Sequence, residues 1–203
     1  MPAAKGSART PLGPTSFYIL EQPDPSYRFR YGSVVEVVAP LHGANSSQTV
    51  KTFPKIKLTN YDKQRFVKAD IIVSCVTHNE EQFPKVHPYM VKNNKRVSVL
   101  LFKSDLLLLG QSFQKKGVNC TNGVCHVKEV EDNGTVEFCD IGIQRVKTQE
   151  TMSSLMERKN MGIDPFRQGF THSQYDKEAV KLCFQVRFVN NQIENHLICF
   201  RSF

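Results

Sequence analysis

Residues 179–188 constrain the fold more than any other stretch of this chain, because apolar and polar side chains alternate along it. Successive side chains of a β-strand point to opposite faces, so the pattern predicts a strand with one buried face. The apolar positions are Val180, Leu182, Phe184, Val186 and Phe188, and the positions between them hold Lys181, Cys183, Gln185 and Arg187. We therefore expect a half-buried strand of an antiparallel sheet.

Further strands are predicted by short runs of β-branched and aromatic residues that end at turn-forming residues. Ala69–Thr77 is the strongest of these runs, and Phe17–Leu20 and Lys51–Leu58 are shorter or less regular. Gly123–Val127 and Thr135–Cys139 are expected to form a hairpin, because the Asn-Gly pair at 133–134 suits the positive φ angles of a type I′ turn.

One amphipathic helix is predicted between Thr148 and Met161. Met152, Leu155 and Met156 fall at helical spacing among polar residues, and a glycine follows the end of the segment. Several short strands with a single helix favour an antiparallel β-sandwich, and 203 residues are enough for one such domain.

The charge of the chain points to polyanionic partners. It has 27 Lys and Arg against 19 Asp and Glu, which gives a net charge of +8. Charge alone does not distinguish nucleic acid from an anionic membrane as the partner. The apolar run Val97–Leu109 is shorter than the roughly 20 residues of a membrane-spanning helix. A hairpin and a short buried helix both remain open for it.

The six cysteines could serve as free thiols or as metal ligands. Residues 1–15 contain no apolar run, which predicts a disordered lead-in without a signal peptide, so all six cysteines are expected to be free thiols in a reducing compartment. Cys120, Cys125, His126 and Cys139 could bind zinc, but the Cys-x4-Cys spacing is loose and lacks a second pair. Because no catalytic motif is present, we expect neither an enzyme nor a cofactor.

Arg28 and Arg30 are the candidate binding residues. In a strand both side chains project from one face while Phe29 turns to the other. The planar donors of arginine match the O6 and N7 acceptors of guanine in the major groove of DNA. Tyr31 would then lie where its phenol can meet a sugar or phosphate. The alternative is an ordinary strand end with an exposed basic pair.

Ten short blocks occur in the order seen in the Rel homology region, and from about Ser16 to Phe188 the chain resembles the DNA-binding half of NF-kappaB/Rel factors, in particular the insect Dorsal and Dif branch. The blocks are Leu20–Pro23, Arg28–Tyr31, Lys51–Pro54, Ile72–Thr77, His87–Pro88, Lys115–Gly117, Gly123–Cys125, Ile141–Gln144, Asp164–Phe166 and Val180–Val186. The resemblance implies an all-β, immunoglobulin-like (p53-like) antiparallel β-sandwich with one inserted helix. It also implies that loops enter the major groove of GGG-containing sites.

The resemblance assigns roles to five residues. Arg28 and Arg30 would read guanines, and Tyr31 would pack on the DNA backbone. Rel proteins also use a lysine pair to grip phosphate before the inserted helix, of which Lys147 retains one, while Arg145 replaces a neighbouring cysteine and can restore the charge. The implied DNA-binding residues are Arg28, Arg30, Tyr31, Arg145 and Lys147.

The chain also departs from the family pattern. After Tyr31, Rel proteins have a cysteine that meets phosphate and a glutamate that accepts from cytosine, whereas this chain has Gly32–Val35. Residues 94–114 are an atypical insertion, and the second, dimerising domain of the family is absent, which predicts a monomer in this truncated form. The expected organisation is a lead-in at 1–15, a Rel homology DNA-binding domain at 16–190 and an unmatched tail at 191–203.

We therefore expect a sequence-specific DNA-binding domain of a transcription factor. It would recognise double-stranded DNA with GGG-containing kappaB-like sites and regulate RNA polymerase II transcription in immune or developmental signalling. Other Rel proteins are the expected protein partners, no membrane is expected, and the location would be nucleus and cytoplasm. The alternative is a truncated Rel-pathway modulator that does not bind DNA, or a non-productive splice product.

Overall fold

The computed structural model of the chain describes residues 16–32, 38–61, 69–78, 84–93, 118–127, 130, 133–170, 175–188 and 198–199. Within these residues the strands form three sheets. The first has the order β1-β3-β8, with β1 at Ser16–Glu21, β3 at Lys55–Thr59 and β8 at Thr135–Glu137. The second has the order β11-β10-β4-β7-β6, with β11 at Ile198–Cys199, β10 at Val180–Phe188, β4 at Ala69–Thr77, β7 at Val124–Val127 and β6 at Val118–Thr121. The third has the order β2-β9-β5, with β2 at Arg30–Tyr31, β9 at Ile141–Arg145 and β5 at Met90–Asn93.

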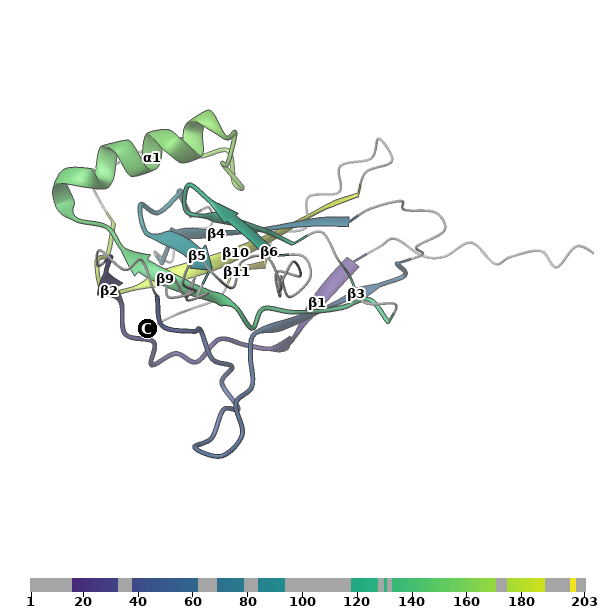
Figure 1. The fold of residues 1–203 in the computed structure, drawn as a ribbon. Helices are drawn as coiled ribbons and strands as arrows, with labels where there is room; N and C mark the ends of the chain where they lie inside the picture. Colours follow the sequence, from purple (N-terminus) through teal and green to yellow (C-terminus); the bar gives the residue numbers. More distant parts are fainter. Residues whose placement is uncertain are drawn as a thin grey trace, which may run out of the picture.

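The three sheets share one hydrophobic core, which confirms the predicted antiparallel β-sandwich. Ile56 of β3, Phe184 of β10 and Ile143 of β9 are fully buried in it, so each sheet contributes side chains. Neighbouring strands run antiparallel except β2 and β9, which run parallel. The helix lies outside the strands, at the end of the molecule where β2 lies (Figure 1).

β4 and β10 form the centre of the second sheet. The predicted strand at Ala69–Thr77 is confirmed with the same bounds. β10 is also confirmed as a strand, but the prediction that it is half-buried is wrong, because Cys183 and Gln185 on its expected outer face are buried as well. Other parts of the chain cover the outer face of this sheet. For example, Ile163, which follows the helix, packs on Ile72 of β4.

The predicted hairpin between Gly123–Val127 and Thr135–Cys139 is wrong. β7 pairs with β6 and β4, whereas β8 pairs with β3 in another sheet. The hairpin forms between β6 and β7, around Asn122 and Gly123, whose φ angles are 50° and 78°. A type I′ turn needs positive φ at both central residues, and Asn-Gly adopts it readily.

The predicted helix is confirmed, but of its three predicted apolar positions only Leu155 is buried. A short 3₁₀ helix, η1, at Thr148–Glu150 leads into α1 at Thr151–Asn160. Met152 and Met156 are 51% and 43% exposed, and the buried face consists of Thr151, Ser154, Leu155 and Arg158.

Arg158 attaches α1 to the residues that precede β5. Its Nη2 group donates hydrogen bonds to the carbonyl oxygens of Pro88 and Tyr89 at 3.0 and 3.1 Å, and Nη1 donates to the Ser154 hydroxyl at 2.7 Å. Burial lowers the pKa of Arg158. The guanidinium group is buried, and carbonyl and hydroxyl oxygens accept hydrogen bonds from its Nη1 and Nη2 groups there.

The expectation that all six cysteines are free is wrong. Cys120 and Cys125 are direct cross-strand partners in the β6–β7 hairpin, with Cα atoms 3.9 Å apart, and they form a disulfide. Cys75 and Cys183 are buried, and Cys139 is half-buried. The disulfide occupies two of the four residues considered as zinc ligands, and the described part of the chain holds no group of three or more His, Cys, Asp or Glu residues placed to bind a metal ion.

Several predicted segments lie outside the described residues. They are the lead-in at 1–15, the insertion at 94–114 and most of the tail at 191–203. Two residues of that tail form β11, which pairs with β10. Of the helices in the described ranges, none has the length and apolar character needed to cross a bilayer.

Candidate nucleic-acid interface

The predicted site begins with residues 27–31, which we call the arginine segment. Arg28 and Arg30 are exposed and Phe29 is half-buried, so the predicted alternation is confirmed. Only Arg30 and Tyr31 form a regular strand, β2, which is shorter than expected. The segment therefore needs further contacts to hold its position.

Two aromatic side chains anchor the arginine segment. The Phe29 ring packs edge-on against Tyr27 and Tyr89, with ring centroids 5.9 and 5.4 Å apart. The Tyr27 hydroxyl donates to the carbonyl oxygen of Ala39 at 2.8 Å and accepts from the backbone N–H of Ile143 at 3.0 Å. Burial raises the pKa of Tyr27, so the phenol stays protonated and keeps both hydrogen bonds.

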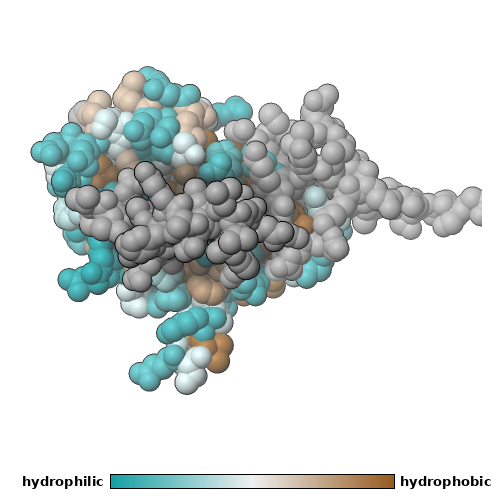
Figure 2. All heavy atoms as spheres, in the orientation of Figure 1, coloured by the Kyte–Doolittle hydropathy of each residue, from teal (hydrophilic) through white to brown (hydrophobic). Residues whose placement is uncertain are grey.

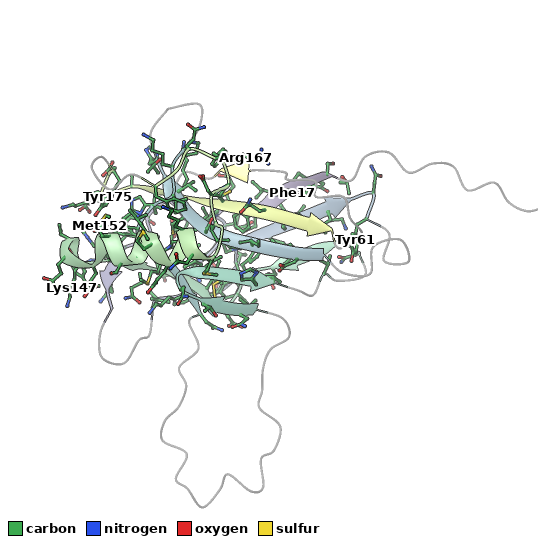
Figure 3. The ribbon with its side chains drawn as sticks, turned by 90° about the horizontal axis from the view of Figure 1, so that it is seen from above. Phe17, Tyr61, Lys147, Met152, Arg167 and Tyr175 are labelled. Carbon is green, nitrogen blue, oxygen red and sulfur yellow. A yellow bond between two sulfur atoms is a disulfide. The ribbon has the colours of Figure 1, made fainter. Side chains whose placement is uncertain are left out.

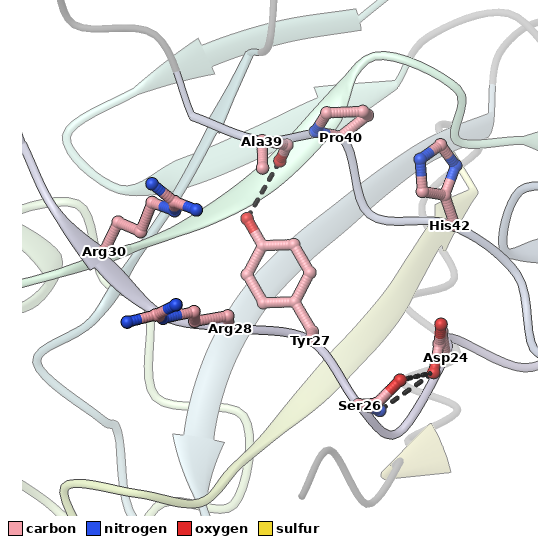
Figure 4. A pocket seen from close by; sticks show the side chains of 8 residues that line it. All are labelled: Asp24, Ser26, Tyr27, Arg28, Arg30, Ala39, Pro40 and His42. Atoms are coloured by element: carbon pink, nitrogen blue, oxygen red, sulfur yellow. Dashed lines mark hydrogen bonds between the residues drawn. The ribbon is translucent and has the colours of Figure 1, made fainter.

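A shallow pocket of about 220 Å³ lies beside the arginine segment. Its lining residues are Asp24, Ser26, Tyr27, Arg28, Arg30, Ala39, Pro40 and His42. Figure 4 shows both arginine side chains on the same side of the Tyr27 ring, away from Asp24 and Ser26. Asp24 accepts hydrogen bonds from the Ser26 hydroxyl and N–H at 2.6 and 2.8 Å, which lower its pKa. Its carboxylate is thus engaged within the turn.

β9 brings a third arginine to the site. β2 pairs with β9 so that Tyr31 lies opposite Arg145, whose guanidinium carbon is 5.2 Å from the Tyr31 ring centroid, within the range of a cation–π interaction. Arg145 Nη2 also donates to Glu178 Oε1 at 2.7 Å. Burial alone would lower the pKa of Arg145, but the hydrogen bond to Glu178 and the electrostatic interactions with Tyr89, Glu178 and Tyr31 together outweigh it, so the pKa is raised and the group stays charged.

The residues before β10 are held by two buried side chains. His87 Nδ1 accepts the N–H of Tyr89 at 3.1 Å, so Nε2 carries the proton and donates to the carbonyl oxygen of Asp176 at 3.0 Å. The Tyr89 hydroxyl donates to the carbonyl oxygen of Lys177 at 2.6 Å. Burial lowers the pKa of His87 to about 4, which keeps the imidazole neutral. These contacts fix the backbone next to Glu178.

Lys147 is exposed, between the buried Val146 and the start of η1. Figure 3 shows Lys147 and Tyr175 at the same end of the molecule, and the Tyr175 and Thr151 hydroxyls are 3.1 Å apart. Hydrophilic side chains are frequent at this end, where α1 and β2 lie (Figure 2). The structure thus gathers the five predicted residues around β2 and the end of β9.

Sequence reasoning missed two residues of this arrangement. Tyr27 precedes Phe29 by two positions and therefore shares its inward face, a signal that could have identified it. Glu178 gave no signal, because it lies 33 residues from Arg145 in the sequence. Ion pairs between distant residues depend on the fold.

The chain is similar to a known protein family. The family model "Rel homology DNA-binding domain" matches residues 17–199. The embryonic polarity protein dorsal of Drosophila melanogaster is 31% identical over 179 residues, which cover 86% of this chain and 15% of dorsal. The transcription factor RelB homolog of Gallus gallus is 27% identical over 187 residues, which cover 90% of this chain and 29% of that protein. The chain therefore spans less than a third of the length of these relatives.

A solved structure is also similar. The structure of the Dorsal homologue Gambif1 bound to DNA matches with a TM-score of 0.69 at 30% sequence identity, and the match covers 92% of this chain and 95% of that chain. This likeness confirms the predicted immunoglobulin-like form of the sandwich.

Proposed function

The chain belongs to the Rel homology DNA-binding domain family, and we propose on this basis that it is the sequence-specific DNA-binding domain of a transcription factor. Proteins of this family are transcription factors and not enzymes. The proposed target is double-stranded DNA with a GGG-containing kappaB-like site. We further propose regulation of RNA polymerase II transcription in immune or developmental signalling, other Rel proteins as partners, and a location in nucleus and cytoplasm.

One observation carries the proposal that this chain reads DNA sequence, namely the exposure of Arg28 and Arg30 on an anchored segment. Tyr27 and Phe29 hold the backbone, so the segment loses little conformational freedom when it binds. Each bidentate contact between an arginine and a guanine discriminates against the wrong base by about 1–3 kcal/mol.

The other three residues are assigned to the DNA backbone. Tyr31 and Lys147 are exposed and would contact sugar and phosphate, which position the protein without reading sequence. Arg145 differs from them, because its charge is already paired with Glu178. In the chain without DNA, its guanidinium group packs on the Tyr31 ring.

A second candidate function is a Rel-pathway modulator that does not bind DNA. It is favoured by Gly32–Val35, which stand where Rel proteins have the cysteine and glutamate that meet phosphate and cytosine. Loss of the glutamate removes an acceptor for cytosine N4, and loss of the cysteine removes one backbone contact.

A binding assay with two duplexes tests the proposal. One duplex contains a GGG half-site, and the other contains the same bases in scrambled order. Wild type should prefer the GGG duplex. Arg30→Ala should weaken binding to it by about 1–3 kcal/mol, or about 5- to 150-fold, with little change on the scrambled duplex.

Two lysine variants separate base reading from backbone contact. Lys147→Ala should weaken binding to both duplexes equally and reduce the slope of log K against log salt by about one unit. Lys159→Ala is the matched control, because it removes the same exposed side chain at the other end of α1. Equal effects of Arg30→Ala on the two duplexes would refute base reading, and no binding by wild type to either duplex at low salt would favour the modulator.

A further inference from the structure

We propose that Glu178 sets the affinity of the interface by holding Arg145 away from the DNA backbone. The inference deepens the proposed function and rests on it. Its structural basis is the contact between Arg145 Nη2 and Glu178 Oε1 at 2.7 Å, next to Tyr31. A cation whose charge is already neutralised by a carboxylate does not release a counterion from phosphate, so the interface has one fewer effective positive charge.

The Arg145 side chain is held from more than one side. Its exposed fraction is only 20%, its guanidinium group lies over the Tyr31 ring, and its backbone is fixed by the pairing of β9 with β2. The carboxylate of Glu178 therefore meets the guanidinium group in a fixed place. Reaching a phosphate would require Arg145 to break this contact.

Glu178 is held on the opposite side of the contact. The carbonyl oxygens of Asp176 and Lys177 accept hydrogen bonds from His87 and Tyr89. The backbone N–H of Glu178 itself donates to the Asp176 carboxylate at 2.8 Å. The backbone that carries the carboxylate is thus positioned before any ligand arrives.

The contact contributes little to folding, which separates an affinity role from a structural one. The Glu178 side chain is 74% exposed, and exposed ion pairs typically contribute about 0–1 kcal/mol to stability. Removing the carboxylate should therefore leave the fold intact and change mainly the charge that faces DNA.

The test compares Glu178→Ala with wild type on the GGG and scrambled duplexes over a range of salt concentrations. Each additional phosphate contact multiplies the binding constant by the salt concentration raised to a power of about −0.9. We expect binding to become about tenfold tighter at 0.1 M salt on both duplexes, with a slope steeper by about 0.9. A merely structural role would not change the slope.

Glu137→Ala is the matched control. Glu137 pairs with Lys55 at 3.0 Å, so its removal also deletes one negative charge and releases one cation. The pair joins β8 and β3, which belong to a different sheet from β2 and β9. This variant should change affinity less than twofold.

A double variant identifies the source of the gain. In an Arg145→Gln background, Glu178→Ala should no longer tighten binding, because there is no guanidinium group to release. A gain that persists in this background would overturn the proposal and indicate simple repulsion by the carboxylate. A gain no larger than that of Glu137→Ala would also overturn it.

Failure of the proposed function gives a different result. If neither wild type nor Glu178→Ala binds either duplex at low salt, DNA binding itself is refuted and the inference falls with it. If wild type does not bind but Glu178→Ala does, the proposal is supported, since the carboxylate then suppresses binding completely.

Discussion

Replacing Tyr27 by Phe should loosen the arginine segment without removing any charge or ring. The change deletes a single oxygen atom, which donates to the carbonyl oxygen of Ala39 and accepts from the N–H of Ile143. Phe29 and the rings around it remain in place. Any effect on DNA binding would therefore come from the position of Arg28 and Arg30.

The size of the effect follows from the surroundings of the two hydrogen-bond partners. Ile143 is almost fully buried, so its N–H would be left without an acceptor, and an unsatisfied buried donor costs about 1–3 kcal/mol. Ala39 is exposed, so water can replace the lost donor to its carbonyl oxygen at little cost. We expect a loss of about 2 kcal/mol in the free energy of unfolding, or about 4–8 °C in Tm for a domain of this size.

Thermal unfolding and the two-duplex binding assay measure the two consequences. Tyr18→Phe is the matched control, because it deletes the same atom from an exposed tyrosine on β1. Tyr27→Phe should lower Tm and reduce the preference for the GGG duplex, whereas Tyr18→Phe should change neither. An unchanged preference in Tyr27→Phe, despite the expected loss of stability, would refute the role of Tyr27 in positioning the arginines.

Two further predictions concern the residues around the site. His87 has a pKa near 6.5 in the unfolded chain and about 4 in the folded chain, so the unfolded chain binds its proton first as the pH falls. The free energy of unfolding should therefore fall by up to about 3 kcal/mol as the pH drops from 6.5 to 4. Denaturant titrations at several pH values should show a flatter dependence of this free energy on pH for His87→Gln than for wild type. Parallel profiles would contradict the burial of a neutral imidazole. Gly142→Ala should destabilise the domain by about 1–3 kcal/mol and weaken binding to the GGG duplex, because the added methyl group would overlap the Ala39 carbonyl oxygen beside the Tyr27 hydroxyl. A Tm equal to that of wild type would show that Gly142 and the Ala39 carbonyl oxygen are not in tight contact.

Local sequence patterns predicted strands well and their partners poorly. Ala69–Thr77 was predicted with its observed bounds, because a run of β-branched residues in the core of a sheet leaves little ambiguity. The two Asn-Gly pairs, at 122–123 and 133–134, carry the same turn signal, but among the strands that the structure describes only the first closes a hairpin. Which strands pair depends on contacts between distant residues, and a short pattern does not contain that information.

The helix and the site show the same limit for side chains. Helical spacing of Met152, Leu155 and Met156 identified α1, but only Leu155 of the three is buried. Arg158 is buried as well, because carbonyl oxygens accept its hydrogen bonds. Alternation correctly placed Arg28 and Arg30 on an exposed face. The position of each side chain was predictable where it follows from backbone geometry and unpredictable where it depends on a partner far along the chain.

The attachment of α1 through Arg158 has a consequence for measurements at different ionic strengths. The described partners of its guanidinium group are carbonyl and hydroxyl oxygens within the protein interior, where dissolved ions do not reach. Added salt weakens contacts between exposed cations and phosphate, but it leaves these hydrogen bonds unscreened. The packing of the helix that follows Lys147 therefore does not change during a salt titration. The slope of log K against log salt then reports on the DNA-facing charges alone.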